Sequence, residues 1–302
     1  MTDIIRRPDL EAQEVSFPEY VGTKVYPWLG KPQIAGKLYF QKYKSDITAQ
    51  YNRDHAALGD ISQNVIAAND LSFSCTELRA RVAMGYTQRI GYGDDEHADL
   101  AQGRLAKRAF FNKTEALIAA KLFDATGAVD GTADPVATID TNVSLLRDCG
   151  IGRVALVIAN GTKIQLKNNA IIKDRMKNTG LGAYDLKEIR NIGDMNLCAA
   201  LGIDEVLTMK DAIAYSGTGK TNAALVVLPD EYEDPAESIQ LGRLVYFMYS
   251  DSTDDRFVME SWHNAVNDSE VVDCKGLVQL QEFNAELRKT ITLFEGDESE
   301  SN

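Results

Sequence analysis

The chain has 302 residues, of which 44% are hydrophobic and 25% charged, a globular composition that excludes collagen-like and low-complexity classes. No apolar run of 18 residues occurs, and the N-terminus lacks the apolar stretch of a secretory signal, so we expect neither a membrane span nor secretion by that route. The cysteines are widely separated, which disfavours a disulfide framework and a zinc site and is typical of reduced thiols in a cytoplasmic protein. They are Cys75, Cys149, Cys198 and Cys274.

Charge is distributed unevenly along the chain. The net charge is −13, and residues 226–302 account for all of it with 5 basic and 18 acidic side chains, because residues 1–225 carry 27 of each. An acidic surface repels phosphate, so tight nucleic-acid binding is disfavoured. Residues 163–190 have the opposite bias, with seven basic and three acidic side chains. Such a run is typical of a solvated face, and it can also orient identical subunits against one another.

The first third of the chain combines irregular and extended segments. Residues 1–36 hold four of the seven prolines and no periodicity, which indicates an extended arm that cannot form a core alone. Strands are predicted at 36–43 and 71–81, and between them lies a polar stretch too long for an ordinary turn.

A long helix is predicted from about residue 96 to 123. Asp94 or Asp95 can cap it, and apolar side chains such as Phe110 and Leu117 recur on one face. A helix of about 28 residues would be about 40 Å long, although Gly103 weakens it by about 1 kcal/mol. Its length beside a long polar excursion favours an elongated subunit over a compact enzyme.

Residues 124–135 have the composition of a linker, and residues 137–227 then alternate helix and strand signals. This alternation predicts an α/β subdomain around a small sheet. Its expected helices are 138–149, 161–177 in two pieces and 186–201, and its expected strands are 153–159, 204–209 and 222–228.

The C-terminal quarter reads as strands. Segments 244–249 and 256–262 flank a polar SDSTDD run and predict a hairpin, and 270–283 predicts one or two more strands. The end, EGDESESN, predicts an acidic, disordered tail. The aromatic residues of this quarter could stack nucleic-acid bases, but core or cross-strand packing is the favoured interpretation. They are Tyr246, Phe247, Tyr249, Phe257 and Trp262.

Residues 214–221 (AYSGTGKT) satisfy a relaxed phosphate-loop pattern. Lys220 would then contact the γ-phosphate and Thr221 a magnesium ion, but the pattern requires a helix directly after it. The next residues, NAALVVL, predict a strand. A Ser/Gly/Thr-rich turn between two strands is therefore favoured over a nucleotide site.

The three histidines give no convincing catalytic constellation. His55 lies in the polar stretch, His263 in a predicted strand, and His97 at a predicted helix start beside Asp94, Asp95 and Asp99. This cluster could bind a metal, but helix capping is the favoured interpretation. We therefore predict no catalytic, cofactor-binding or metal site, no cofactor, and a protein that is not an enzyme.

Four stretches, taken in order, resemble the major capsid proteins of tailed bacteriophages, which have the Hong Kong 97 capsid fold. Residues 98–124 look like the long spine helix of that family, and 151–177 are similar to its strand–turn–helix segment. Residues 196–209, with the fragment LGIDEVL, resemble the next helix and strand, and 73–85 resemble the strand that leaves the extended loop. The order of these fragments is more specific than any one of them.

This resemblance implies an α+β subunit with a domain map. Residues 1–36 would be an N-terminal arm and 37–82 an extended β-hairpin loop, both buried on neighbouring copies and mobile in an isolated subunit. Residues 83–136 and 230–294 would form a peripheral domain that contains the spine helix. Residues 137–229 would form an α/β axial domain, and 295–302 the acidic tail.

The implied function is a structural major capsid protein that forms hexamers and pentamers of an icosahedral shell around double-stranded DNA. It would be located in the virion, and in the host cytoplasm during assembly. Expected partners are further copies of the chain, a separate scaffolding protein because no long extension precedes the arm, a portal, an optional decoration protein, and DNA that is contacted weakly without sequence preference. Three alternatives stay open: an encapsulin-like compartment, a nucleotide-dependent enzyme using Lys220, and a metal-dependent hydrolase using Asp94, Asp95 and His97.

Overall fold

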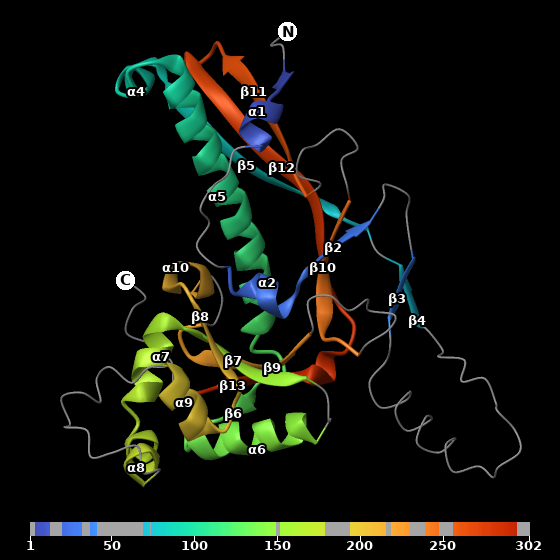
Figure 1. Cartoon of the computed structure of the whole chain (residues 1–302), viewed down its shortest axis with the longest axis vertical. Helices are drawn as coiled ribbons and strands as arrows, with labels where there is room; N and C mark the ends of the chain where they lie inside the picture. The colour runs from blue at the N-terminus through green and yellow to red at the C-terminus, as the bar shows by residue number, and fades with distance from the viewer. Residues whose placement is uncertain are drawn as a thin grey trace, which may run out of the picture.

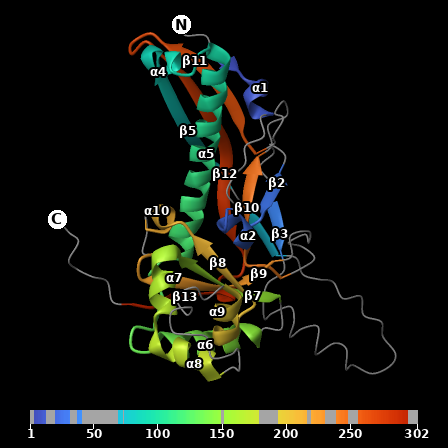
Figure 2. The same ribbon diagram turned by 60° about the vertical axis from the view of Figure 1, so that its left-hand side comes forward.

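The computed structural model has an elongated body with a sheet-containing unit at each end (Figures 1 and 2). It describes residues 4–12, 20–31, 37–40, 69–72, 74–148, 152–178, 194–215, 219–229, 239–247 and 256–294. In these segments no helix is long and apolar enough to cross a membrane. Helix α5 (Asp95–Leu122) runs along the body and reaches both units.

The first sheet is six-stranded and packs along α5. Its path is β1-β11-β12-β10-β2, and β5 also pairs with β12. All pairs are antiparallel except β10 with β2. The strands are β1 (Ile5–Arg6), β2 (Trp28–Lys31), β5 (Thr76–Gly85), β10 (Gly242–Phe247), β11 (Val258–Asn264) and β12 (Ser269–Glu282).

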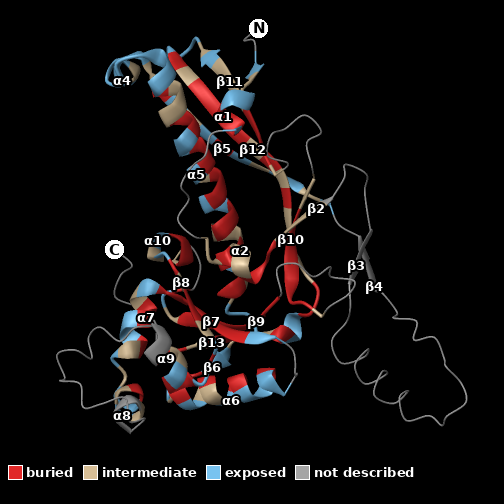
Figure 3. Cartoon of the chain, in the orientation of Figure 1, coloured by how far each residue is buried: buried red, intermediate tan, exposed pale blue. Residues whose placement is uncertain are grey.

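Helix α5 confirms the predicted long helix to within a residue at each end. The Asp94 side chain caps it by accepting a hydrogen bond from the His97 N–H at 2.7 Å. Its buried face contains Phe110, Ile118 and Leu122, and Figure 3 shows this face turned toward the sheet. The apolar stripe thus gives α5 its position as the shared support of both units.

The second sheet is five-stranded, with the order β6-β13-β9-β7-β8. Its central strands β7 and β9 coincide with the predicted strands and are almost wholly buried. Helix α6 (Pro135–Arg147) packs on β9, β13 and β7, α7 (Asn160–Lys167) packs on β7 and β8, and α9 (Asp194–Leu201) packs on β8. The strands are β6 (Val129–Asp130), β7 (Arg153–Ala159), β8 (Glu205–Met209), β9 (Asn222–Leu228) and β13 (Arg288–Thr292).

The remaining elements are short. Strands β3 (Lys37–Phe40) and β4 (Asn69–Ser72) pair antiparallel at one side of the body. The strand predicted at 71–81 is therefore two strands, β4 and β5, in different sheets. The helices not yet named are α1 (Pro8–Glu11), α2 (Gly22–Val25), α4 (Tyr86–Ile90), α8 (Ala170–Asn178), α10 (Asp211–Ala214) and the 3₁₀ turn η2 (Ala285–Leu287).

The predicted hairpin between 244–249 and 256–262 is wrong. Strands β10 and β11 do not pair with each other: β11 pairs with residues 269–275 of the long strand β12, and β10 pairs with residues 277–282 of the same strand. The true hairpin joins β11 to β12 through a turn in which Asp268 has a φ of 44°. Aspartate tolerates this left-handed conformation better than most residues, and this is why the chain reverses here.

Several sequence-based expectations meet limits in the structure. Strands β6 and β13 come from ranges expected in the peripheral domain, yet they pair within the second sheet beside β9. Helix α9 (Asp194–Leu201) lies within the helix expected at 186–201, and residues 186–193 of that expectation lie outside the described residues. Most of the expected loop, the tail 295–302, His55, Cys149 and Tyr249 lie outside the described residues. The domain map as a whole stays a prediction.

Candidate functional site

The phosphate-loop-like segment does not have the geometry of a phosphate site in the part that the structure describes. Gly219 is packed so closely that a Cβ atom would lie 2.4 Å from the Ala214 carbonyl oxygen. The Thr162 hydroxyl lies 3.0 and 2.9 Å from the carbonyl oxygens of Gly219 and Lys220. Strand β9, not a helix, follows at Asn222, so the helix that the phosphate-loop pattern requires directly after it is replaced by a strand. The expected strand at 204–209 is present as β8, and the short helix α10 lies between it and this segment.

Replacing Lys220 with alanine tests this conclusion directly. We expect the variant to match the wild type in both oligomeric state and nucleotide binding, because the Lys220 amine lies over the Tyr215 ring, 5.7 Å from its centroid, rather than at a phosphate cradle. Calorimetric titration with Mg·ATP and negative-stain microscopy measure the two properties. Saturable binding by the wild type that the variant loses would contradict the expectation.

The acidic cluster around His97 is occupied by helix capping and arginine pairing. The His97 Nδ1 atom lies 2.8 Å from Asp94 Oδ1, and Asp99 pairs with both Arg7 and Arg89 at 2.8 Å. Asp95 also pairs with Arg89, at 3.1 Å. The described residues contain no group of three or more side chains able to hold a metal. These carboxylates therefore fix the start of α5 and attach the N-terminal strand to it.

The first part of the N-terminal segment is packed on its own subunit. Leu10 is fully buried against Gly103 of α5, where a Cβ would lie 3.2 Å from a Leu10 methyl group. The Lys107 amine donates to the Glu11 carbonyl oxygen at 2.6 Å, and the Glu11 carboxylate accepts from the Met259 N–H at 3.0 Å. These residues therefore have packing contacts within their own subunit, whereas the expected arm is mobile in an isolated subunit; its burial on neighbouring copies stays a prediction.

A second part of the same segment packs nearer the C-terminal end of α5. The Gly22 N–H donates to Glu115 Oε1 at 2.8 Å, and Val25 and Tyr26 are fully buried. The Tyr26 hydroxyl donates to Glu282 Oε1 at 3.1 Å. This arrangement delivers β2 to the edge of the first sheet, where it pairs in parallel with β10.

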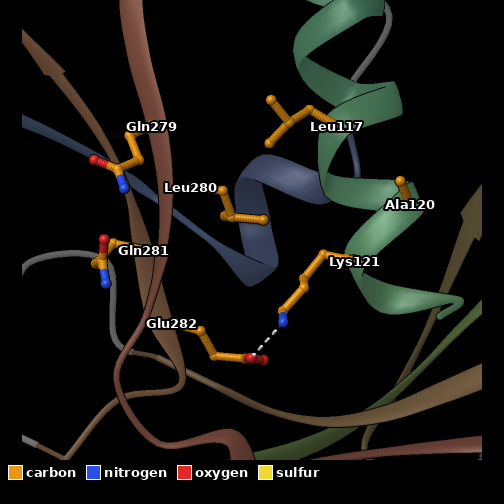
Figure 4. Close-up of a pocket in the computed structure, with 7 residues that line it drawn as sticks. All are labelled: Leu117, Ala120, Lys121, Gln279, Leu280, Gln281 and Glu282. Carbon is orange, nitrogen blue, oxygen red and sulfur yellow. Dashed lines mark ion pairs between the residues drawn. The ribbon is translucent and has the colours of Figure 1, made fainter. Parts of the chain in front are cut away.

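A hollow of about 630 Å³ lies between the C-terminal turns of α5 and the end of β12 (Figure 4). Leu117 and Leu280 face it from the two elements, and the Lys121 amine lies 3.2 Å from Glu282 Oε2 across it. Glu282 also pairs with Arg288 at 3.0 Å, and these two cations help to keep its pKa below the usual value despite burial. The hollow is thus bordered by a closed ion network and presents no free nucleophile or general base.

Several large apolar side chains are exposed on α4, on β1 and its preceding residue, in the β11–β12 turn and just before α5. The labelled elements α4, β1 and β11 lie at the upper end of the body in Figures 1 and 3. Val266 in that turn is 91% exposed, and Ile4, Ile5, Tyr86, Ile90 and Tyr92 are also exposed. We call this set the distal patch. Exposed apolar clusters of this kind are typical of protein–protein contacts. Sequence analysis missed the patch, although YTQRIGY just before the long helix carries apolar residues at i, i+4 and i+6.

Comparison by sequence finds no match among family models or curated proteins. Comparison by structure finds many. A phage-related protein from Bordetella bronchiseptica RB50 superposes with a TM-score of 0.66 at 13% identity, covering 96% of this chain and 97% of that one. The capsid of cyanophage P-SCSP1u gives 0.54 at 8% identity, covering 94% and 92%. A virus-like particle from Pyrococcus furiosus gives 0.50 at 8% identity, covering 95% and 96%.

These matches extend over nearly the whole length of both chains, so they concern the complete arrangement of α5 and the two sheets rather than a shared motif. They confirm the α+β class and the fold that the resemblance implied. The chain has the Hong Kong 97-type fold of tailed-phage capsid proteins.

Proposed function

We propose that the protein is the structural major capsid protein of a tailed bacteriophage, which self-assembles through hexamers and pentamers into an icosahedral shell around double-stranded DNA. The observation that carries this proposal is the match to a cyanophage capsid over 94% of the chain. Two further features support it. The carboxylates near His97 and the segment around Lys220 are engaged in structural contacts, and an apolar patch is exposed at one end of an elongated body.

The experiment that tests the proposal is expression of the full chain, alone and with its neighbouring phage genes, followed by size-exclusion chromatography and negative-stain microscopy. Closed shells of uniform diameter, or capsomers that close when a scaffolding protein is added, are expected. A monomer that stays solitary at high concentration under every condition would contradict the proposal.

The domain roles follow from the same proposal. Residues 83–136 and 230–294 serve as the peripheral domain and 137–229 as the axial domain, with β6 and β13 joining the latter's sheet. Residues 1–36 act as the arm, 37–82 as the extended loop and 295–302 as the acidic tail. Proposed partners are further copies of the chain, a separate scaffolding protein, a portal and a decoration protein, in the virion and in the host cytoplasm during assembly.

Weak contact with DNA is the expected consequence of the charge distribution. Since residues 226–302 carry 18 acidic and 5 basic side chains, we expect no gel shift of linear DNA by micromolar subunits at 0.15 M salt. The same assay at low salt is the control for residual electrostatic attraction. A tight complex at 0.15 M salt would contradict a shell wall that lets DNA move during filling.

An encapsulin-like compartment is the second candidate function, favoured by the match to a virus-like particle from Pyrococcus furiosus. The two functions predict different contents. A compartment would enclose a co-expressed protein cargo without any DNA-packaging machinery, whereas the capsid would enclose scaffolding protein and then DNA. Mass spectrometry and nuclease-resistant DNA measured on purified particles separate them.

A further inference from the structure

Glu115 is a carboxylic acid placed inside an apolar contact between α5 and the N-terminal segment. Its side chain is buried, with 3% of the residue exposed, and Ile118 lies on the same face of α5. Oxygen Oε1 accepts the Gly22 N–H at 2.8 Å, but Oε2 is sealed from solvent and has no hydrogen-bond partner. An ionised carboxylate in such a place lacks the solvation that water would give it.

Gly22, the hydrogen-bond partner of Glu115, is packed tightly against α5. A Cβ atom on Gly22 would lie 2.6 Å from Glu115 Oε2 and 2.9 Å from Ile118, so glycine is needed for this close approach. Val25 and Tyr26 follow immediately and are fully buried. The carboxyl group therefore lies where the segment that leads into the edge strand β2 is held against α5.

The surrounding charges do not neutralise the carboxylate directly. Lys210, ahead of α10, favours its charged form from a distance, and Tyr20 faces it from the chain before α2. Lys24 of α2 pairs instead with Glu205, at 3.7 Å. Burial thus outweighs the backbone donors of Gly22 and Val21 and raises the pKa of Glu115 to about 7. Burial raises the pKa of Tyr20, and the nearby charge of Arg108 on α5 partly opposes this effect.

We propose that Glu115 is a protonation switch for the N-terminal segment: its neutral form holds α2 against α5, and its ionisation loosens that contact. Undocking of residues 20–27 would expose the carboxyl group to water and return its pKa to the ordinary value. Ionisation of Glu115 therefore stabilises the undocked state relative to the docked state. The consequence reaches the first sheet, because the Pro27 carbonyl accepts the Leu244 N–H at 3.0 Å and β2 pairs with β10. This switch is a property of the single chain and goes beyond the proposed function.

The sign of the pH dependence follows from the raised pKa in the docked state. The stabilisation of the docked state by neutral Glu115 is fully present below the ordinary glutamate pKa of about 4.5, and it is lost as the pH rises through about 7. The opening equilibrium of residues 20–27 should therefore increase up to about tenfold per pH unit between pH 5 and 7 and level off above that range.

Hydrogen exchange measured on the full chain tests the switch, with wild type and Glu115→Gln compared at each pH in the same oligomeric state. The ratio of their exchange rates cancels the intrinsic pH dependence of exchange. Because glutamine mimics the neutral acid, we expect the ratio of wild-type to variant exchange rates for amides 20–26 to rise about a hundredfold from pH 5 to 8. Glu96→Gln, an exposed position at the start of α5, is the matched control and should leave the ratio at one.

A second variant keeps the test decisive if Glu115→Gln does not fold. Lys210→Met removes the charge that favours ionised Glu115, so the transition in wild-type protection of residues 20–27 should move to higher pH. A purely structural role for Glu115 would leave the midpoint unchanged. A ratio that stays constant from pH 5 to 8, or a midpoint that Lys210→Met does not move, would overturn the proposal, and neither readout depends on shell formation.

Discussion

Replacing Phe110 with alanine is expected to lower the free energy of unfolding by about 3–5 kcal/mol, among the largest effects for one side chain in this protein. Phe110 is fully buried, and its ring centroid lies 5.5 Å from that of Phe111 and 5.8 Å from that of Phe257. Its Cζ atom comes so near β12 that a Cβ on Gly276 would lie 2.7 Å from it. Truncation would therefore open a cavity between α5 and the first sheet that rigid strands cannot close.

Urea unfolding of the unassembled chain measures this loss, and Leu105→Ala is the matched control. Leu105 lies on the same helix but is 44% exposed, so its truncation should change the free energy of unfolding by no more than about 0.5 kcal/mol. Equal losses in the two variants would mean that the contact between α5 and the sheet does not hold the body together.

Local patterns predicted the elements of this fold well. The Asp94 cap and the apolar spacing around Phe110 placed α5, and the unbroken apolar runs RVALVIA and NAALVVL placed β7 and β9. Each of these signals depends on neighbours in sequence, such as a side chain that bonds to its own helix. They carry over to the structure because no distant partner is needed to satisfy them.

Local patterns did not predict which strands pair or which isolated residues are buried. Strands β10 and β11 were identified, but a strand's sequence does not say which neighbour it takes, and both pair with β12 rather than with each other. Leu10 and Tyr26 are single apolar residues among prolines and charges, too sparse to show periodicity, and their burial depends on α5 approximately 90 residues later. Glu115 read as an ordinary helix charge, because only the approach of Gly22 buries it.

The N-terminal segment should be separable from the body, and Leu10→Ala tests this. Truncating a fully buried leucine costs about 2–5 kcal/mol, but β1 and α1 together span few residues and can detach without unfolding the sheets. We therefore expect hydrogen-exchange protection of amides 5–11 to fall at least about tenfold, while the urea midpoint of the body changes little.

Ile4→Ala is the control for Leu10→Ala, since Ile4 lies in the same segment but is exposed, and it should leave both readouts unchanged. If Leu10→Ala lowers the urea midpoint as far as Phe110→Ala does, the segment is part of the cooperative core. In that case it could not be released to a neighbouring copy without unfolding its own subunit. A local loss alone would mean that the contacts of Leu10 and of Lys107 with Glu11 hold a detachable arm, whose docking a shell could exchange for contacts between subunits.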